Sequence, residues 1–184
     1  MKRGLHWLPV TRVKRTLIPE PLRVCLLDTG SLTNRLARYC KGNFGLRLQG
    51  QSWQRPLPDE NQALNLRRGS NALVREIYLQ CNDVPWVYGR SIIPEHTCTG
   101  SERRLAFWGQ RSLGNYLFSG HNIRRGEIEI ARIRPQDKLF QLACRDATAD
   151  RSRLWGRRSI FYIKDKPLLV VEIFLTDLIR CMNT

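Results

Sequence analysis

Alternating apolar and polar residues predict a strand from Leu73 to Cys81. Successive side chains of a strand point to opposite faces, so Leu73, Ile77, Leu79 and Cys81 share one face. Arg75 lies in the middle of that apolar face. A buried guanidinium without a partner is costly, so Arg75 needs either an acidic partner or a polar ligand.

A second run, from Leu168 to Leu175, is apolar on both faces and predicts another buried strand. Glu172 is its only charge. Periodicity alone leaves three possibilities open for Arg75 and Glu172. They form a structural ion pair, they reach water at the ends of the sheet, or they face a polar ligand in a cavity.

The remaining strands and turns predict an antiparallel sheet. The predicted strands are 46–49, 73–81, 85–93, 126–133, 159–164 and 168–175. Tight turns at Asn82-Asp83 and Asp165-Lys166 join two pairs of them into hairpins. Arg90 shares a face of its strand with the large apolar groups Trp86, Tyr88 and Ile92. In 126–133 the glutamates alternate with isoleucines, and we expect them to be solvated.

Short helices complete the prediction. They are expected over 21–27, from an N-cap at Ser31 to about Cys40, over 101–107 and 112–118, and for a turn or two within 136–143. Residues 1–20 are expected to form a loosely packed arm, and 134–153 an insertion or loop. An antiparallel sheet with short helices packed on it implies one α+β domain over 21–184.

Composition narrows the class of protein. The chain has 184 residues, with 31 Lys+Arg against 16 Asp+Glu, a formal net charge of +15. Such a field attracts anions, which include nucleic acids, anionic membranes and small metabolites. The basic residues are scattered or paired, and no nucleic-acid-binding motif accompanies them, so no nucleic-acid partner is expected. No apolar run is long enough to span a membrane, and no signal peptide is evident, so we expect a cytoplasmic protein.

The six cysteines and three histidines give little sign of a metal site. No two cysteines are spaced as CxxC, and the histidines are isolated, so no metal is expected. We expect six free thiols that serve mainly in packing. A nucleophilic pair of Cys98 and His96 is an alternative, although nothing in the sequence orients it.

Six segments, in this order, are similar to segments of the chorismate pyruvate-lyase family. They are Gly30-Ser31-Leu32-Thr33-Asn34-Arg35-Leu36, Val74-Arg75-Glu76-Ile77-Tyr78-Leu79, Pro85-Trp86-Val87-Tyr88-Gly89-Arg90-Ser91, Ser112-Leu113-Gly114-Asn115-Tyr116-Leu117-Phe118, Leu154-Trp155-Gly156-Arg157-Arg158-Ser159 and Pro167-Leu168-Leu169-Val170-Val171-Glu172-Ile173-Phe174-Leu175. They cover the chain from about residue 20 to 175. Each segment alone is a weak signal, but six in the family's order are a strong one.

The resemblance implies a fold and a reaction. The fold would be an antiparallel sheet with helical flaps over an enclosed ligand cavity. The reaction would be the removal of pyruvate from chorismate to give 4-hydroxybenzoate, the first committed step of ubiquinone biosynthesis. The family resemblance implies a bacterial carbon–oxygen lyase that needs no cofactor or metal and whose partners are its substrate and product. We expect a monomer.

The resemblance also assigns roles to residues. Arg75 would bind the ring carboxylate, because a planar guanidinium contacts both oxygens. Glu172 would face the 4-oxygen, and in an apolar pocket its pKa would be raised so that it could donate a hydrogen bond or a proton. Leu32 and Leu113 would line the site with backbone N–H groups and apolar surface, unless they are ordinary core residues. These implications come from the family and not from periodicity.

Arg90 is our own candidate for the second carboxylate, and together with Glu172 it is a candidate catalytic residue. The alternative for Arg90 is a salt bridge to Glu76 or another acid on a strand. Arg157 and Arg158 are expected to be structural. The stretch from 134 to 153 is longer than a minimal family member needs.

Three other functions remain open. The ligand-sensing domains of some bacterial transcription regulators resemble this fold and bind small molecules without converting them. A basic protein associated with nucleic acid would lose binding steeply with salt. A degenerate lyase would keep the fold without activity, although the joint presence of Arg75 and Glu172 argues against it.

Overall fold

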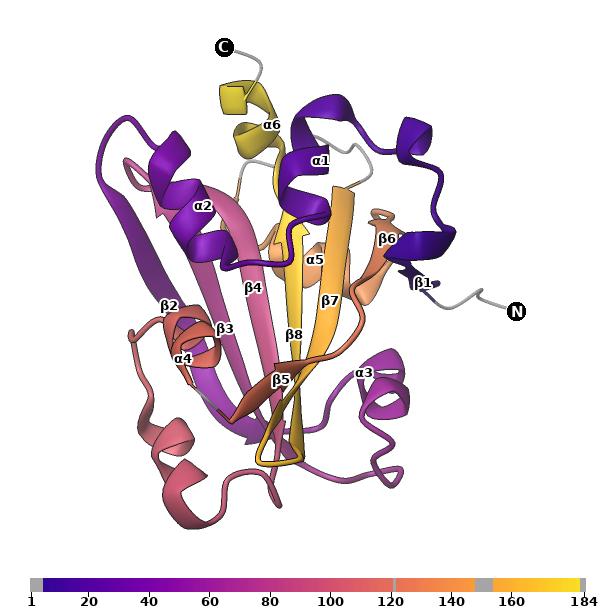
Figure 1. Cartoon of the computed structure of the whole chain (residues 1–184), viewed down its shortest axis with the longest axis vertical. Coiled ribbons are helices and arrows are strands. Elements are labelled where there is room, and N and C mark those ends of the chain that lie inside the picture. Colours follow the sequence, from indigo (N-terminus) through magenta and orange to yellow (C-terminus); the bar gives the residue numbers. More distant parts are fainter. Residues whose placement is uncertain (1–4, 121, 148–153, 183–184) are drawn as a thin grey trace.

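One antiparallel sheet organises the molecule, and helices cover both of its faces (Figure 1). This computed structural model describes residues 5–120, 122–147 and 154–182. The strand order is β1-β6-β7-β8-β4-β3-β2, and β5 pairs with β7. The strands are β1 (Leu8–Pro9), β2 (Phe44–Gln54), β3 (Ala72–Cys81), β4 (Val84–Pro94), β5 (Ile123–Arg125), β6 (Glu129–Ile133), β7 (Leu154–Ile163) and β8 (Lys166–Phe174).

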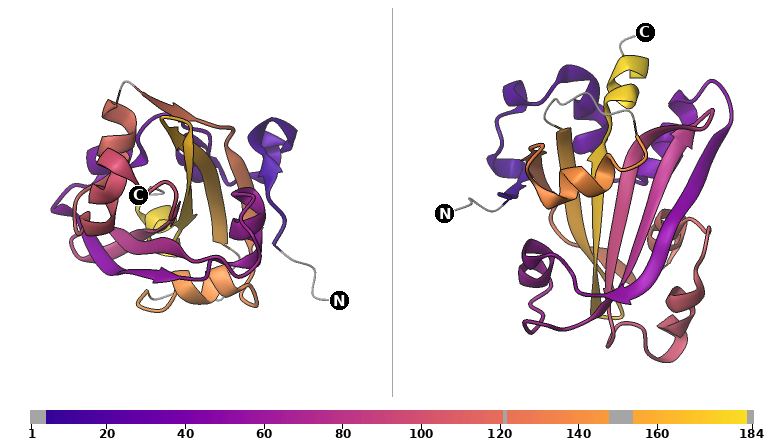
Figure 2. Two further views of the ribbon diagram at one scale, coloured as in Figure 1. Left: turned by 90° about the horizontal axis from the view of Figure 1, so that it is seen from below. Right: turned by 180° about the vertical axis from the view of Figure 1, so that it is seen from behind.

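The helices lie on opposite sides of the sheet. The α-helices are α1 (Glu20–Leu26), α2 (Leu32–Tyr39), α3 (Pro58–Ala63), α4 (Leu113–Ser119), α5 (Lys138–Ala143) and α6 (Thr176–Met182). The 3-10 helices are η1 (Val10–Arg12), η2 (Arg15–Leu17) and η3 (Gly100–Phe107). Helices α2 and α4 lie over one face, here called the front face, while α5 lies behind the sheet (Figures 1 and 2). The α+β class predicted from the sequence is confirmed.

The alternation of side chains divides the core between the two faces. On the back face, one cluster joins strand residues such as Val74, Tyr78 and Tyr88 to α5 and the end of α3. On the front face there are two clusters. One lies beneath α1, α2 and α6 and includes Leu36 and Phe174; the other lies beneath η3 and α4. The front face is therefore not filled continuously along its length.

Two tight turns set the register of the central hairpins. Asn82 and Asp83 have φ of 50° and 62°, and Lys164 and Asp165 have φ of 47° and 66°. Two consecutive residues in the left-handed region are typical of a two-residue hairpin turn that matches the twist of its strands. The first turn lies where the sequence predicts it. The second lies one residue earlier than the predicted Asp165-Lys166.

Most predicted elements are present, with changed bounds. The Ser31 side chain accepts a hydrogen bond from the Asn34 N–H, so the predicted N-cap of α2 is confirmed. The predicted strand over 46–49 is the middle of the longer β2, and β6 begins only at Glu129. Strand β7 begins at Leu154 and not at 159, whereas residues 148–153 of the predicted loop lie outside the described residues.

Part of the expected N-terminal arm belongs to the sheet. Leu8 and Pro9 pair with Ile130 and Glu129 of β6, and Trp7 and Ile18 are buried. The expectation of a loosely packed arm is therefore wrong for these residues. They pack because Trp7 joins the back-face cluster and Ile18 joins the front. A domain boundary at residue 20 stays a prediction.

Two further expectations about side chains need correction. Cys40 at the end of α2 and Cys81 at the end of β3 form a disulfide, with their Cα atoms 5.7 Å apart, so the six cysteines are not all free. Sequence spacing could not reveal this pair, because the two lie 41 residues apart. Glu129 is not fully solvated either: its carboxylate pairs with the Arg158 Nε at 2.7 Å.

Candidate active site

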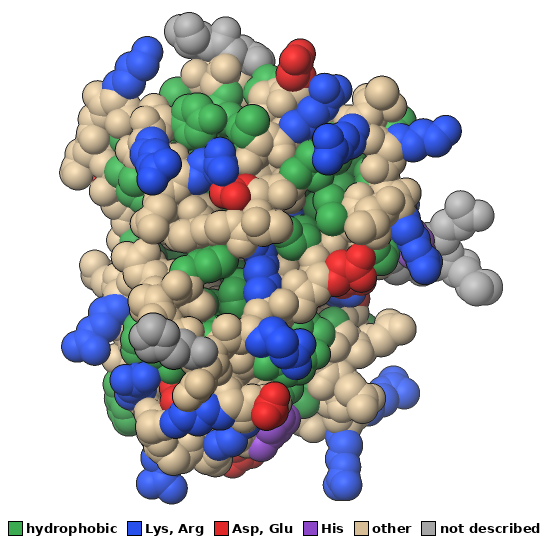
Figure 3. All heavy atoms as spheres, viewed as in Figure 1, with side chains coloured by type: hydrophobic (Ala, Val, Ile, Leu, Met, Phe, Trp, Pro, Cys, Tyr) green, Lys and Arg blue, Asp and Glu red, His purple; other side chains and the backbone are tan. Residues whose placement is uncertain are grey.

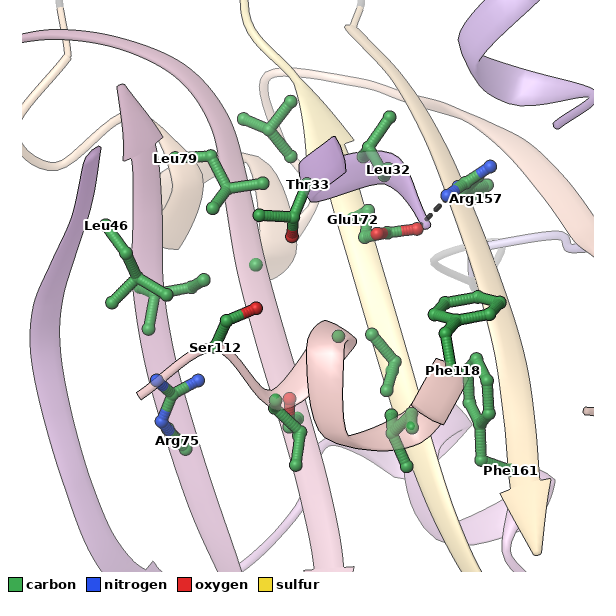
Figure 4. Close-up of a pocket in the computed structure, with 18 of the residues that line it drawn as sticks. Leu32, Thr33, Leu46, Arg75, Leu79, Ser112, Phe118, Arg157, Phe161 and Glu172 are labelled. Carbon is green, nitrogen blue, oxygen red and sulfur yellow. Dashed lines mark hydrogen bonds and ion pairs between the residues drawn. The ribbon is translucent and has the colours of Figure 1, made fainter. Parts of the chain in front are cut away.

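A pocket lies on the front face, between the two front clusters of the core (Figure 4). Its floor comes from β3, β4, β7 and β8, and its roof comes from α2 and α4, here called the flap helices. Central strand β4 presents Gly89 and Ser91 to the floor, next to larger groups on β3 and β8. These small side chains leave space over the middle of the sheet.

Arg75 lies at one end of the pocket and is only 2% exposed. Its Nε and Nη2 donate to the Gly109 carbonyl at 3.2 and 2.9 Å, and Nη2 also donates to the Arg111 carbonyl at 2.8 Å. Among the described residues no carboxylate pairs with it, and its Nη1 has no hydrogen-bond partner. Burial lowers the pKa of Arg75 to about 10, which leaves it charged at neutral pH. A charged, buried guanidinium with a free N–H donor is well suited to bind an anion.

Glu172 on β8 lies at the opposite end of the pocket from Arg75. The Arg157 Nε donates to its carboxylate at 2.5 Å, while the Arg157 Nη1 donates to the carbonyls of Cys25 and Asp28 at 2.6 and 2.7 Å. The sequence analysis expected an apolar environment for Glu172. The structure instead places the guanidinium of Arg157 beside it. The carboxylate oxygens of Glu172 can accept further hydrogen bonds from a ligand.

Arg75 and Glu172 do not pair with each other. Figure 4 shows them on opposite sides of the pocket. Strand β4 lies between their strands, and their partners on it, Ser91 and Gly89, are two residues apart. With strands about 4.8 Å apart and about 3.4 Å per residue, their Cα atoms are separated by about 12 Å. That separation leaves room for a six-membered ring between the two side chains.

Leu32 and Leu113 cover the pocket at the first residues of the two flap helices. Both are buried, and both follow a serine whose side chain caps its helix. The helices approach closely at Gly114, where an added Cβ would lie 3.2 Å from the Thr33 Oγ1. Glycine at position 114 therefore allows the two flap helices to close over the pocket.

Arg125 on β5 also lines this pocket, which the sequence did not indicate. Its Nε donates to the Ser159 Oγ at 3.1 Å, and its Nη1 donates to the carbonyls of Asp28 and Thr29 at 3.4 and 3.0 Å. Its guanidinium also lies 5.3 Å from the Phe161 ring centre. The available signal was weak, because Arg124-Arg125 resembles any exposed basic pair.

Arg157 was expected to be structural, yet it lines the pocket and holds Glu172. The register of the second hairpin places Arg157 directly opposite Glu172. The predicted turn, displaced by one residue, would instead put Ser159 there. A one-residue error in the turn therefore concealed the partner of the key carboxylate.

The structure does not bring Arg90 to the pocket. Its side chain lies on the back face, where Nε and Nη2 donate to Glu60 at 2.7 and 3.2 Å and Nη1 donates to Glu76 at 3.0 Å. The hypothesis that Arg90 binds a second carboxylate is therefore corrected, because two protein carboxylates already occupy this guanidinium. The salt bridge to Glu76 that we named as the alternative is present.

Two other kinds of feature are absent from the described residues. No group of three or more His, Cys, Asp or Glu side chains within that part of the chain could hold a metal ion. None of its helices is long and apolar enough to cross a membrane.

The fold and the pocket define a class of protein, one that binds a small polar ligand between a sheet and two flap helices. Comparison with known proteins narrows this class. A family model described as chorismate lyase matches residues 2–181. The chain belongs to the chorismate lyase family, and it is accordingly an enzyme, a carbon–oxygen lyase.

Curated relatives agree with this assignment. A protein of Methylococcus capsulatus named probable chorismate pyruvate-lyase is 40% identical over 150 residues, which are 82% of this chain and 91% of that protein. A protein of the same name from Nitrosomonas eutropha is 36% identical over 171 residues, 93% of each chain.

Solved structures show the same fold in regulators. The ligand-binding domain of a GntR-family transcriptional regulator from Bordetella bronchiseptica has a TM-score of 0.51 and 18% identity, covering 73% of this chain and 86% of that one. The C-terminal domain of the histidine utilization repressor from Pseudomonas syringae has a TM-score of 0.52 and 10% identity, covering 73% and 93%. At these identities the likeness concerns the fold alone.

Proposed function

We propose that this enzyme removes pyruvate from chorismate and releases 4-hydroxybenzoate. One observation carries the proposal: Arg75, which has no acidic partner among the described residues, and Glu172 lie at opposite ends of one pocket. Chorismate and its aromatic product both carry a carboxylate at one end of a six-membered ring and a hydroxyl at the other. The names of the curated relatives support this choice of substrate.

The two ends of the pocket suit the two ends of that ring. The free Nη1 of Arg75 donates to the ring carboxylate, and the Glu172 carboxylate accepts a hydrogen bond from the 4-hydroxyl. Arg157 fixes the Glu172 side chain through its Nε and is itself anchored by two backbone carbonyls. The ring is thereby oriented by two side chains that are held in place before it arrives.

The reaction breaks one C–O bond and one C–H bond. The C3–O bond breaks, and its electron pair leaves with the enolpyruvate. The C4 hydrogen leaves as a proton, and the electrons of the C4–H bond complete the aromatic ring. The enolpyruvate gains a proton and becomes pyruvate. Because aromatisation drives the step, we propose that it needs no cofactor, and that the pocket contributes orientation and exclusion of water.

We place this reaction in the cytoplasm as the first committed step of ubiquinone biosynthesis, carried out by a monomer. Leu32 and Leu113 contribute apolar surface to the roof over the ring. Closure of that roof would hold the product as well as the substrate, because both share the ring, the carboxylate and the hydroxyl.

The test is to mix the purified protein with chorismate and to follow pyruvate and 4-hydroxybenzoate by chromatography. We expect equimolar products from the wild type. Arg75→Ala should reduce affinity for 4-hydroxybenzoate at least about 100-fold, since loss of one member of a buried charged contact costs about 3–5 kcal/mol. The matched control is Arg47→Ala, which removes an exposed arginine of neighbouring strand β2 and should leave both readouts unchanged.

The outcomes separate the candidate functions. A folded wild type that forms no product would contradict the lyase proposal. If that protein still bound 4-hydroxybenzoate, it would be a sensor or a degenerate lyase, in keeping with the fold shared with regulator domains. Equal losses in Arg75→Ala and Arg47→Ala would remove Arg75 from the site.

A further inference from the structure

We propose that Arg125 binds the carboxylate of the enolpyruvyl group, the second carboxylate of the substrate. This inference rests on the proposed function and extends it to a residue that the family's segments in this sequence did not single out. Arg125 takes the role that the sequence analysis gave to Arg90, whose side chain lies on the back face of the sheet.

Arg125 lies at the Glu172 end of the pocket. Its Nη1 and the Nη1 of Arg157 both donate to the carbonyl of Asp28, in the turn between α1 and α2. Its guanidinium is 5.7 and 5.3 Å from the ring centres of Phe118 and Phe161. Figure 4 shows both rings on the side of Glu172 and away from Arg75.

The charge of Arg125 is only partly balanced within the described protein, by the more distant carboxylates of Glu172 and Asp28. Its hydrogen bonds go to one hydroxyl and two carbonyls, and no carboxylate among the described residues pairs with it. Its Nη2 has no hydrogen-bond partner there. Burial, followed by the nearby positive charge of Arg157, lowers the pKa of Arg125 to about 10. A bound anion would offset both penalties.

The other arginines of the pocket are committed to other partners. Arg157 already holds Glu172 and two carbonyls. Arg75 lies at the far end, where the ring carboxylate is proposed to bind. Near Glu172, Arg125 is therefore the pocket arginine that forms no ion pair with a described carboxylate and keeps an unoccupied donor, whereas Arg157 is ion-paired with Glu172.

The shape of the substrate fits this position. The enolpyruvyl ether is attached at C3, next to the C4 that carries the hydroxyl. When the hydroxyl faces Glu172, the ether must leave the ring at the Glu172 end of the pocket, where Arg125 lies. The leaving group takes the second carboxylate with it, so Arg125 contacts the substrate and enolpyruvate but not 4-hydroxybenzoate.

This difference between substrate and product provides the test. Arg125→Gln should lower kcat/KM for chorismate by about 10- to 100-fold, the usual effect of losing a hydrogen bond to a charged group. Its dissociation constant for 4-hydroxybenzoate, measured by calorimetry, should stay within about 2-fold of the wild type. The matched control is Arg124→Gln, because Arg124 is the adjacent residue of β5, is exposed and lies over the Tyr162 ring outside the pocket.

A structural role predicts a different pattern. If Arg125 only held the turn at Asp28 and Thr29, chorismate turnover and 4-hydroxybenzoate binding would fall together, and the inference would be overturned. It would also be overturned if Arg125→Gln matched Arg124→Gln in turnover. Should Arg125→Gln fail to fold, Arg125→Lys supplies the same comparison, because it keeps the charge but lacks the planar fork. We expect it to lose chorismate turnover selectively.

Failure of the proposed function gives another result. In that case the wild type itself forms no pyruvate from chorismate. The inference alone fails when the wild type is active but the Arg125 variants do not lower kcat/KM for chorismate more than they weaken binding of 4-hydroxybenzoate.

Discussion

At the scale of single residues, the buried arginines Arg75, Arg90 and Arg157 differ in the residue that lies opposite them on a neighbouring strand. Arg90 is opposite Glu76 and Arg157 is opposite Glu172, and both form ion pairs. Arg75 is opposite Ser91, which offers no charge. The same residue type therefore stabilises the protein at two positions and remains available to a ligand at the third.

Arg90→Met should destabilise the protein by about 3–5 kcal/mol, because it leaves Glu60 and Glu76 without their buried cation. Urea unfolding measures the loss. Adding Glu60→Gln to the variant should recover part of it. The control is Arg104→Met, at an arginine that is 55% exposed and 3.8 Å from Glu102, which should cost less than about 1 kcal/mol. Equal losses in both variants would contradict the importance of the back-face network.

At the scale of elements, the turn between α1 and α2 connects the roof of the pocket to its charged end. The Asp28 carboxylate accepts hydrogen bonds from the Gly30 N–H at 2.9 Å and from the Arg35 Nε at 2.5 Å. The carbonyl of the same residue accepts from Arg125 and Arg157. A turn of this kind couples the start of flap helix α2 to two arginines of the pocket.

Asp28→Asn should lower the free energy of unfolding by about 1 kcal/mol at neutral pH. The hydrogen bond from Arg35 lowers the pKa of Asp28 below its usual 3.8. Stability from a depressed carboxyl is complete above the pKa of the unfolded chain and is lost as pH falls through the folded value. The difference between variant and wild type should therefore shrink below about pH 4 in thermal unfolding. Asp165→Asn, at an exposed turn, should show no such trend.

The Cys40–Cys81 disulfide links the C-terminal end of flap helix α2 to the end of β3. A crosslink that closes a loop of 41 residues should stabilise the folded state by about 3–4 kcal/mol under oxidising conditions. Cys40→Ser should lose this stability and should no longer respond to a reductant. Cys98→Ser is the control, because Cys98 is a free cysteine. If the wild type unfolds identically with and without reductant, the crosslink contributes nothing.

At the scale of the whole molecule, the formal charge of +15 surrounds a pocket proposed to take a dianion. Lys and Arg side chains are spread over the face in Figure 3 and do not gather in one patch. A distributed positive field raises the rate at which anions arrive without favouring one docking surface. We therefore expect the charge to act on the encounter with an anionic substrate.

Ionic strength should accordingly change kcat/KM for chorismate more than kcat. Between about 0.01 M and about 1 M salt the Debye length shortens from about 30 to about 3 Å, which screens the field outside the pocket. We expect kcat/KM to fall by about 3- to 10-fold, while kcat changes little because the substrate in the closed pocket is screened much less. A kcat/KM that is independent of salt would indicate that the field plays no part in capture.

The sequence predicted the first hairpin and the start of flap helix α2 well, because these depend on local signals. The alternation around Arg75, the Asn82-Asp83 turn and the serine before Leu32 each act within a few residues. What it could not predict depends on pairing at long range. The Cys40–Cys81 crosslink joins α2 to β3, the position of Arg125 requires β5 to pair with β7, and the sheet edge at β1 requires residues 8–9 to meet β6.

The faces of strands explain the error at Arg90. Periodicity placed Arg90 correctly among large apolar groups such as Tyr88, but it could not say which side of the sheet those groups occupy. Arg75 and Arg90 are both flanked by apolar residues, yet their side chains point to opposite faces. The choice depends on register: Arg75 is paired with Ser91, and Arg90 is one residue away from that pair.

The neighbours Arg75 and Glu76 therefore divide two tasks within one strand, since one faces the pocket and the other the ion network behind it. A single-residue insertion or deletion between them and the turn would exchange their faces. It would put a carboxylate where an anion is proposed to bind and a second guanidinium beside Arg90. Strand β3 therefore has to keep its length for both the chemistry and the stability to survive.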